Sequence, residues 1–169
     1  VEIFSTVIKK APYGEYAAPA QYKIGLFLLE KQMYQEARDE FEKTRNDYPD
    51  SEWAKAAHYQ IAIADSKRST GVQYDQKVTE SAIKEFNEFL KQYPDAELSD
   101  KAKTQVSDLR EQEAEKAFLV AKFYIKQKKY KAAKLYLSKI VDDYKNTSWA
   151  PKALEKIREI NAQYPHSDN

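Results

Sequence analysis

One spacing recurs in three places along this chain of 169 residues. A small residue is followed after 4 residues by a large apolar one, after 7 more by a tyrosine, and at the next position by a closing residue. Self-similarity of this kind indicates a repeat architecture, in which each unit buries its apolar face against its neighbours. Any fold of this chain must therefore stack copies of one unit. The three frames are Ala37, Phe41, Tyr48, Pro49; Ala82, Phe86, Tyr93, Pro94; and Ala133, Leu137, Tyr144, Lys145.

A second small residue precedes each frame and indicates that each unit is a pair of helices. Gly25 and Ala121 stand 12 residues before the small residue of the first and third frames. Ala62 stands 20 residues before that of the second frame. Small residues at facing positions let two helices approach closely. Because only 3 glycines and 6 prolines interrupt the chain, the pattern predicts an all-α fold, a superhelix of antiparallel helix pairs. The eight extra residues of the second unit predict a loop at 68–78, around Gly71.

Prolines and capping residues set the expected helix bounds. Pro49 and Pro94 end second helices, and Ser51 suits an N-cap. Phe4 stands eight residues before Pro12, as Phe41 does before Pro49, so residue 1 is expected inside a second helix and the chain is expected to be a fragment. We expect helices at 15–31, 34–47, 52–68, 78–92, 97–128, 130–144 and 148–163. We expect one domain over 1–169, with the end of an upstream repeat at 1–13, repeats at 14–50, 51–95 (with the inserted loop) and 96–146 (with an extended first helix), and a capping helix at 147–164.

Composition argues against several functions. The 28 Lys and Arg nearly balance 27 Asp and Glu, so no overall field attracts nucleic acid, and none is predicted as a partner. There is no cysteine, and His58 and His166 lie in no spacing typical of a metal site or a catalytic triad. Phosphate-binding glycine motifs are missing, and no apolar run reaches the 18 residues of a membrane span. The sequence predicts a binding protein that is not an enzyme, with no catalytic residue, cofactor or metal.

Four positions of the first full unit match a known repeat. Gly25, Ala37, Phe41 and Pro49 stand at positions 8, 20, 24 and 32 of the unit, and with this pattern the chain resembles the tetratricopeptide repeat. Three segments are further similar to the BamD family of lipoproteins, which belong to the machinery that assembles outer-membrane β-barrel proteins in Gram-negative bacteria. These segments are APYGEYA at 11–17, DQKVTESAIKEFNEFLKQYP at 75–94 and AKFYIKQKKYKAAKLYL at 121–137.

The resemblance implies a function, a location and partners. It implies a non-catalytic scaffold on the periplasmic face of the outer membrane, attached only through a lipid anchor upstream of this chain. The scaffold would dock the POTRA domain of the barrel subunit and help to receive unfolded outer-membrane protein segments. The family's DQxxT element corresponds to Asp75, Gln76 and Thr79, and Tyr136 stands where many members have an arginine that contacts the partner subunit. A generic tetratricopeptide-repeat adaptor for another cell-envelope or secretion complex is the alternative.

The first helices of the pairs predict an apolar groove. In stacked helical hairpins these helices line the concave wall, and here the wall positions are largely apolar or aromatic. Such a wall suits an extended apolar peptide, for example an unfolded β-barrel segment. The other interpretation is that superhelical curvature, or the upstream repeat, covers these side chains as core. The candidate groove residues are Tyr22, Leu26, Leu29, Tyr59, Ile63 and Phe118.

A basic turn is the second candidate surface. Six lysines occur between Lys122 and Lys134, and positive charge at this density suits an acidic partner domain or lipid head groups. A solvated turn is the other interpretation. Since the resemblance implies that the C-terminal repeats bind the POTRA domain, the candidate contacts are Lys128, Lys129, Tyr130 and Tyr136.

Overall fold

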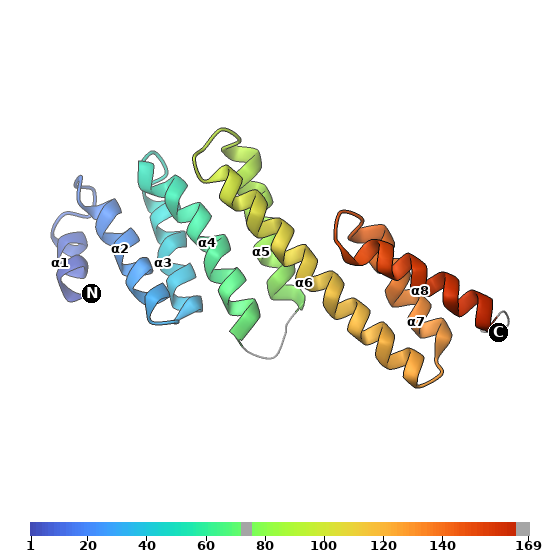
Figure 1. Cartoon of the computed structure of the whole chain (residues 1–169). Helices are drawn as coiled ribbons and strands as arrows, with labels where there is room; N and C mark the ends of the chain where they lie inside the picture. The colour runs from blue at the N-terminus through green and yellow to red at the C-terminus, as the bar shows by residue number, and fades with distance from the viewer. Residues whose placement is uncertain (72–75, 165–169) are drawn as a thin grey trace. The chain divides into compact units, whose positions relative to one another are not determined.

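The computed structural model describes residues 1–71 and 76–164, and this part of the chain consists of helices joined by turns, with no strand. Consecutive helices form antiparallel pairs joined by short connections (Figure 1). The predicted all-α fold of paired helices is therefore confirmed. Asp75, at the start of the DQxxT element, lies outside the described residues. The helices are α1 (Glu2–Lys10), α2 (Ala17–Glu30), α3 (Tyr34–Asp47), α4 (Glu52–Gly71), α5 (Gln76–Gln92), α6 (Ser99–Lys126), α7 (Tyr130–Asp143) and α8 (Trp149–Gln163).

The helices form two compact units, Val1–Val106 and Ser107–Asn169, and the boundary falls inside α6. In the first unit each helix packs against the next in sequence, from α1 to α5, and α2 also contacts α4. In the second unit α7 packs against α8, and the C-terminal part of α6 joins them in one core. Each unit therefore has a hydrophobic core of its own.

In the first unit, α2 and α3 approach closely at Gly25. A Cβ atom added to Gly25 would lie 2.6 Å from Cε1 of Phe41, so the absence of a side chain lets the phenyl ring lie directly against the α2 backbone. Phe41 and Ala37 are fully buried. The glycine and the phenylalanine of the repeat pattern thus form one packing contact between paired helices.

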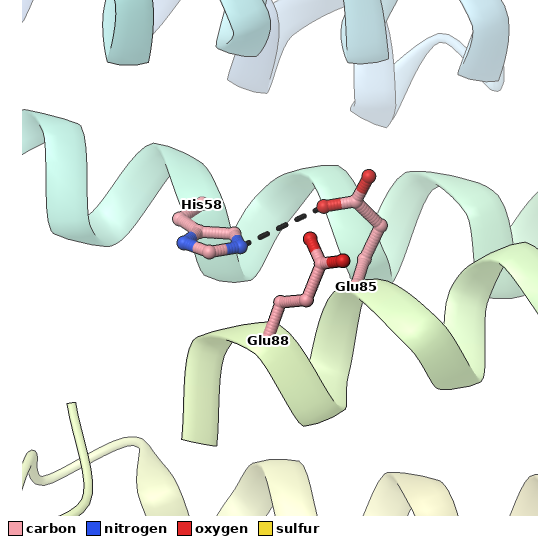
Figure 2. A group of neighbouring side chains, drawn as sticks. All are labelled: His58, Glu85 and Glu88. Atoms are coloured by element: carbon pink, nitrogen blue, oxygen red, sulfur yellow. Dashed lines mark ion pairs between the residues drawn. The ribbon is translucent and has the colours of Figure 1, made fainter. Parts of the chain in front are cut away.

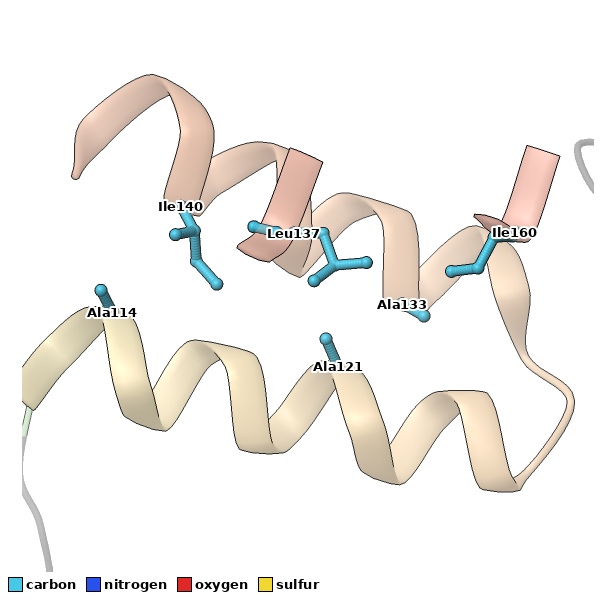
Figure 3. Packing of buried hydrophobic residues seen from close by; sticks show 7 residues of the cluster. Ala114, Ala121, Ala133, Leu137, Ile140 and Ile160 are labelled. Atoms are coloured by element: carbon cyan, nitrogen blue, oxygen red, sulfur yellow. The ribbon is translucent and has the colours of Figure 1, made fainter. Parts of the chain in front are cut away.

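In the second unit, the core repeats this arrangement with different residues. Ala114 and Ala121 of α6 face Leu137 and Ile140 of α7, and Ile160 of α8 completes the cluster (Figure 3). Ala121 and Leu137 follow Gly25 and Phe41 by 96 residues each. Alanine thus replaces the smaller glycine on the first helix, and leucine replaces the larger phenylalanine on the second.

The tryptophans follow the same offset. Trp53 packs against Tyr22, with ring centroids 5.2 Å apart, and Trp149 packs against Phe118 at 5.1 Å. The two pairs lie 96 residues apart, so the tryptophans are equivalent packing residues of two repeats.

One local expectation is wrong. Helix α4 continues to Gly71, although a loop was expected from Arg68. The buried Ser69 donates its hydroxyl to the Ser66 carbonyl at 2.7 Å, so this polar group is satisfied inside the helix. Ser148 precedes α8 but makes no capping hydrogen bond; its backbone N–H donates to Glu111 instead. Ser51 does cap α4, since its Oγ accepts the Ala54 N–H at 3.2 Å.

Across the described residues, every helix is too short or too polar to cross a bilayer.

Candidate functional site

The basic turn joins α6 to α7 with one residue in the left-handed region. Lys128 has φ 57°, and its N–H donates to the Ile125 carbonyl at 2.9 Å. Gln32, 96 residues earlier, has φ 61° between α2 and α3. The turn is therefore a repeated structural element, and it ends α6 so that the Lys128 and Lys129 side chains are exposed to solvent.

One face of α7, together with this turn, forms an open hollow of about 840 Å³. The lining of the hollow is mainly apolar and includes four lysines, and Leu135, which is 70% exposed, offers apolar surface in it. No acidic residue is among its lining residues in the described chain. Positive charge around exposed apolar surface suits a partner that is acidic at its edge and apolar at its centre. The lining residues are Lys128, Lys129, Tyr130, Lys131, Ala132, Lys134, Leu135 and Ser138.

The two candidate tyrosines take different positions. Tyr130 lines the hollow and stacks on Tyr164, with ring centroids 4.0 Å apart and planes 17° apart. A hydrogen bond with Tyr164 raises the pKa of the Tyr130 phenol. Tyr136 does not line the hollow and stacks instead on Tyr124 of α6 at 5.6 Å. Three of the four predicted contact residues therefore lie together, and Tyr136 supports α7 from its packed side.

The predicted apolar wall is partly core. Tyr22 and Tyr59 are each only 9% exposed. Tyr22 packs against Phe41 at 5.4 Å, and burial raises the pKa of its hydroxyl. Tyr59 contacts Phe86 and Phe89 at 5.8 and 5.6 Å. Both tyrosines therefore present little surface to a peptide, because the neighbouring second helices cover their rings.

The other wall residues are more accessible. Leu26 is 36% exposed, and Leu29 and Ile63 on the packed helices α2 and α4 are partly exposed. Phe118 belongs to the second unit, where it is partly exposed beside Trp149. The structure thus leaves Leu26 as the most open residue of the predicted groove.

A small apolar hollow between α1 and α2 was missed by the sequence analysis. Its volume is about 190 Å³, and the Lys23 ammonium lies 5.7 Å from the centre of the Phe4 ring inside it. Pro19, a wall residue at position 2 of its repeat, was the available signal. The lining residues are Ile3, Phe4, Val7, Tyr16, Pro19, Ala20 and Lys23.

A polar cluster at the α4–α5 interface was also missed. His58 of α4 lies beside Glu85 and Glu88 of α5, and one potential ligand atom of each lies within 4.8 Å of the others (Figure 2). His58 Nε2 is 3.6 Å from a Glu85 oxygen. Glu85 follows His58 by 27 residues, so no local motif joins them, and only the pairing of α4 with α5 brings them together.

Arginines of α3 connect this cluster to a second buried carboxylate. Arg38 lies 3.2 Å from the fully buried Asp65 and 3.5 Å from Glu85, and Arg45 is also 3.5 Å from Glu85. Ser81 donates its hydroxyl to Asp65 at 2.9 Å. The pKa of Glu85 lies below its ordinary value because its contact with His58, with the charges of Arg45 and Arg38, outweighs the effect of burial. The network ties three successive helices together through charge.

Comparison with known proteins gives two family matches. The model of a family described as outer membrane lipoprotein (YfiO) matches residues 63–168, and a tetratricopeptide-repeat model matches residues 19–51. The chain is 25% identical over 159 residues to the outer membrane protein assembly factor BamD of Caulobacter vibrioides. The aligned residues are 94% of this chain and 52% of that protein, so the chain spans about half the length of this relative.

Proposed function

Because this chain belongs to the outer membrane lipoprotein family and has the tetratricopeptide-repeat fold, we propose that it is a non-catalytic scaffold of the machinery that assembles outer-membrane β-barrel proteins. It docks the POTRA-bearing barrel subunit and helps to receive unfolded outer-membrane protein segments. It acts at the periplasmic face of the outer membrane.

The α7 hollow is the observation that carries the docking proposal. Lys128 and Lys129 line it and Leu135 is exposed within it. Apolar surface at the centre supplies most of the affinity of a protein interface, and rim charges direct approach and orientation. This arrangement supports a docking surface for a folded acidic domain, with Tyr130 held at its edge by the Tyr164 ring.

A titration with the POTRA domain tests the docking. Calorimetry of the chain with the membrane-proximal POTRA domain of the same organism should give saturable one-to-one binding. Replacing Lys128 and Lys129 by Glu should weaken it roughly tenfold at low salt and less at high salt, because rim charges are screened.

The matched control is the double change of Lys9 and Lys10 to Glu. These lysines are exposed in the last turn of α1. Replacing them changes the net charge by the same amount as replacing Lys128 and Lys129, but at a place distant in the sequence. Equal weakening by both pairs would show a general charge effect and refute the basic turn as an interface. If the folded chain binds no POTRA domain at all, the generic adaptor becomes the better interpretation.

The receipt of unfolded segments is assigned to the accessible part of the apolar wall. We place it in the first unit, at Leu26 with the partly exposed Leu29 and Ile63. Phe118 of the second unit is a separate candidate contact. Tyr22 and Tyr59 support this wall from the core. The test is the fluorescence anisotropy of a labelled peptide with the alternating apolar residues of a β-barrel strand.

Leu26→Glu should weaken the binding of this peptide about fivefold, since covering the exposed part of a leucine contributes about 1 kcal/mol. Leu154→Glu is the control, because Leu154 of α8 has a similar exposure of 39%. Unchanged affinity for Leu26→Glu would remove α2 from the peptide site and leave the docking proposal intact.

A further inference from the structure

We propose that His58, Glu85 and Glu88 form a binding site for a divalent transition-metal ion, best suited to Zn²⁺, that links α4 to α5. The site is separate from the docking and peptide surfaces proposed above. Two independent observations support it, namely the convergence of three ligand atoms and the state of the histidine.

The first observation is a buried histidine whose two ring nitrogens make no hydrogen bond within the described part of the chain. His58 is only 4% exposed, and neither Nδ1 nor Nε2 has a hydrogen-bond partner among the described residues. Buried polar atoms in folded proteins are hydrogen-bonded in the large majority of cases. The edges of the ring rest on Phe89 and Tyr93, with centroids 5.8 and 6.1 Å away, so its orientation is fixed. Nε2 faces the α5 carboxylates (Figure 2) and lies 3.6 Å from a Glu85 oxygen, beyond hydrogen-bond distance.

The second observation is the spacing of the donor atoms. Glu85 and Glu88 are three residues apart and share one face of α5, directed at the imidazole from the other helix (Figure 2). Zinc bonds of about 2.1 Å in a tetrahedral site place neighbouring ligand atoms about 3.4 Å apart. The distance of 3.6 Å between His58 Nε2 and Glu85 is close to this spacing, and all three donors lie within 4.8 Å of one another.

The chemistry of the donors favours zinc over calcium or magnesium. One imidazole and two carboxylates are a zinc ligand set of the type that leaves a fourth position open, whereas the harder cations prefer oxygen ligands alone. Glu88 is about half exposed, and its ion pair is with the exposed Lys84, at 3.7 Å. An ion thus has a route from solvent, and Glu88 loses little when it turns from the lysine to the metal.

The neighbouring arginines lower the affinity of the site for a cation, but Glu85 and Glu88 still supply ligand atoms. Arg38 and Arg45 lie 3.5 Å from Glu85 and oppose a further cation. Both arginines also pair with Glu42, at 2.9 and 3.8 Å. Their positive charge is therefore shared between Glu42 and Glu85, and Glu85 is only partly neutralised. Glu85 and Glu88 together supply the two negative charges that balance Zn²⁺.

Calorimetric titration of the chain with ZnCl₂ in a weakly coordinating buffer tests the site. We expect one Zn²⁺ per chain and a rise in the unfolding temperature, because a ligand that binds only the folded state stabilises it. Glu88→Gln should weaken binding at least tenfold, in the range known for changes around metal sites. Since Glu88 is exposed, this variant keeps the fold intact, and His58→Gln should give the same loss.

Two control variants exclude other zinc ligands. Glu159→Gln removes a comparably exposed glutamate that also pairs with a lysine of its own helix, and His166→Gln removes the only other histidine. Both should bind Zn²⁺ as the unmodified chain does. Absence of binding to the unmodified chain, full binding by Glu88→Gln, or loss of binding in His166→Gln would each overturn the proposal.

Discussion

Gly25→Ala is a demanding test of the repeat packing, because two effects of opposite sign compete at this position. Alanine in place of glycine inside a helix gains about 1 kcal/mol of intrinsic stability. The new Cβ, however, would lie 2.6, 2.7 and 3.0 Å from three atoms of the Phe41 ring, where carbon atoms ordinarily stay about 3.5 to 4.0 Å apart. The ring must therefore move by about 1 Å.

Phe41 has little room for that movement. It is fully buried and packed against the Tyr22 ring. Overpacking of a closed core costs about 1 to 3 kcal/mol, so we expect a net loss of about 1 kcal/mol, or about 2 to 4 °C in unfolding temperature. Urea unfolding followed by Trp53 fluorescence in a Trp149→Phe background measures the first unit, because Trp53 packs beside Tyr22.

The double variant Gly25→Ala/Phe41→Leu separates the clash from other effects. It recreates the alanine–leucine pair that occurs at Ala121 and Leu137 of the second unit. We expect Gly25→Ala to be destabilising beside the phenyl ring but stabilising in the Phe41→Leu background, where the smaller side chain leaves room for the new Cβ. A gain of stability from Gly25→Ala in the unmodified chain would refute the close approach of α2 and α3.

Three further predictions follow from burial and backbone geometry. Tyr22→Ser should destabilise the first unit by about 3 kcal/mol because it empties a core site, whereas Leu26→Ser on the exposed side should cost less than about 1 kcal/mol; equal losses in urea unfolding would contradict the assignment of the wall. Lys128→Gly should stabilise the second unit by about 1 kcal/mol, since glycine adopts a φ of 57° without strain; a lower unfolding temperature would contradict this. Burial raises the pKa of the Tyr59 hydroxyl above 10.0. The stability that the buried, protonated hydroxyl contributes is therefore complete below pH 10 and is lost as the pH rises through the pKa of the folded state. Tyr59→Phe should make alkaline unfolding less steep, and an identical pH profile would contradict the burial of the hydroxyl.

Local sequence signals were sufficient to predict the helix pairs. Gly25, Phe41 and Pro49 stand at fixed spacings because each repeat satisfies the same packing within about 35 residues. The equivalence of Trp53 and Trp149 followed from the same offset. These features are determined by contacts between helices adjacent in the chain, which spacing alone encodes.

Features that depend on the next repeat could not be read from spacing. Tyr22 occupies a wall position, but Phe41 and Trp53 pack against its ring and make it core. His58 and Glu85 meet across two helices, and a lone histidine in a sequence gives no sign of its partners. Thr79 of the DQxxT element was assigned by resemblance, and the structure adds only that its hydroxyl is buried without a hydrogen-bond partner in the described part of the chain.

Site-specific photo-crosslinking of the full-length protein in its own cells tests the docking proposal most directly. A photoreactive amino acid replaces Leu135 in the α7 hollow or, as the matched position, Ile3 of α1, which is 79% exposed. We expect a crosslink from position 135 to the POTRA domain of the barrel subunit and none to that domain from position 3. A POTRA crosslink from position 3 with none from position 135 would contradict α7 as the docking surface.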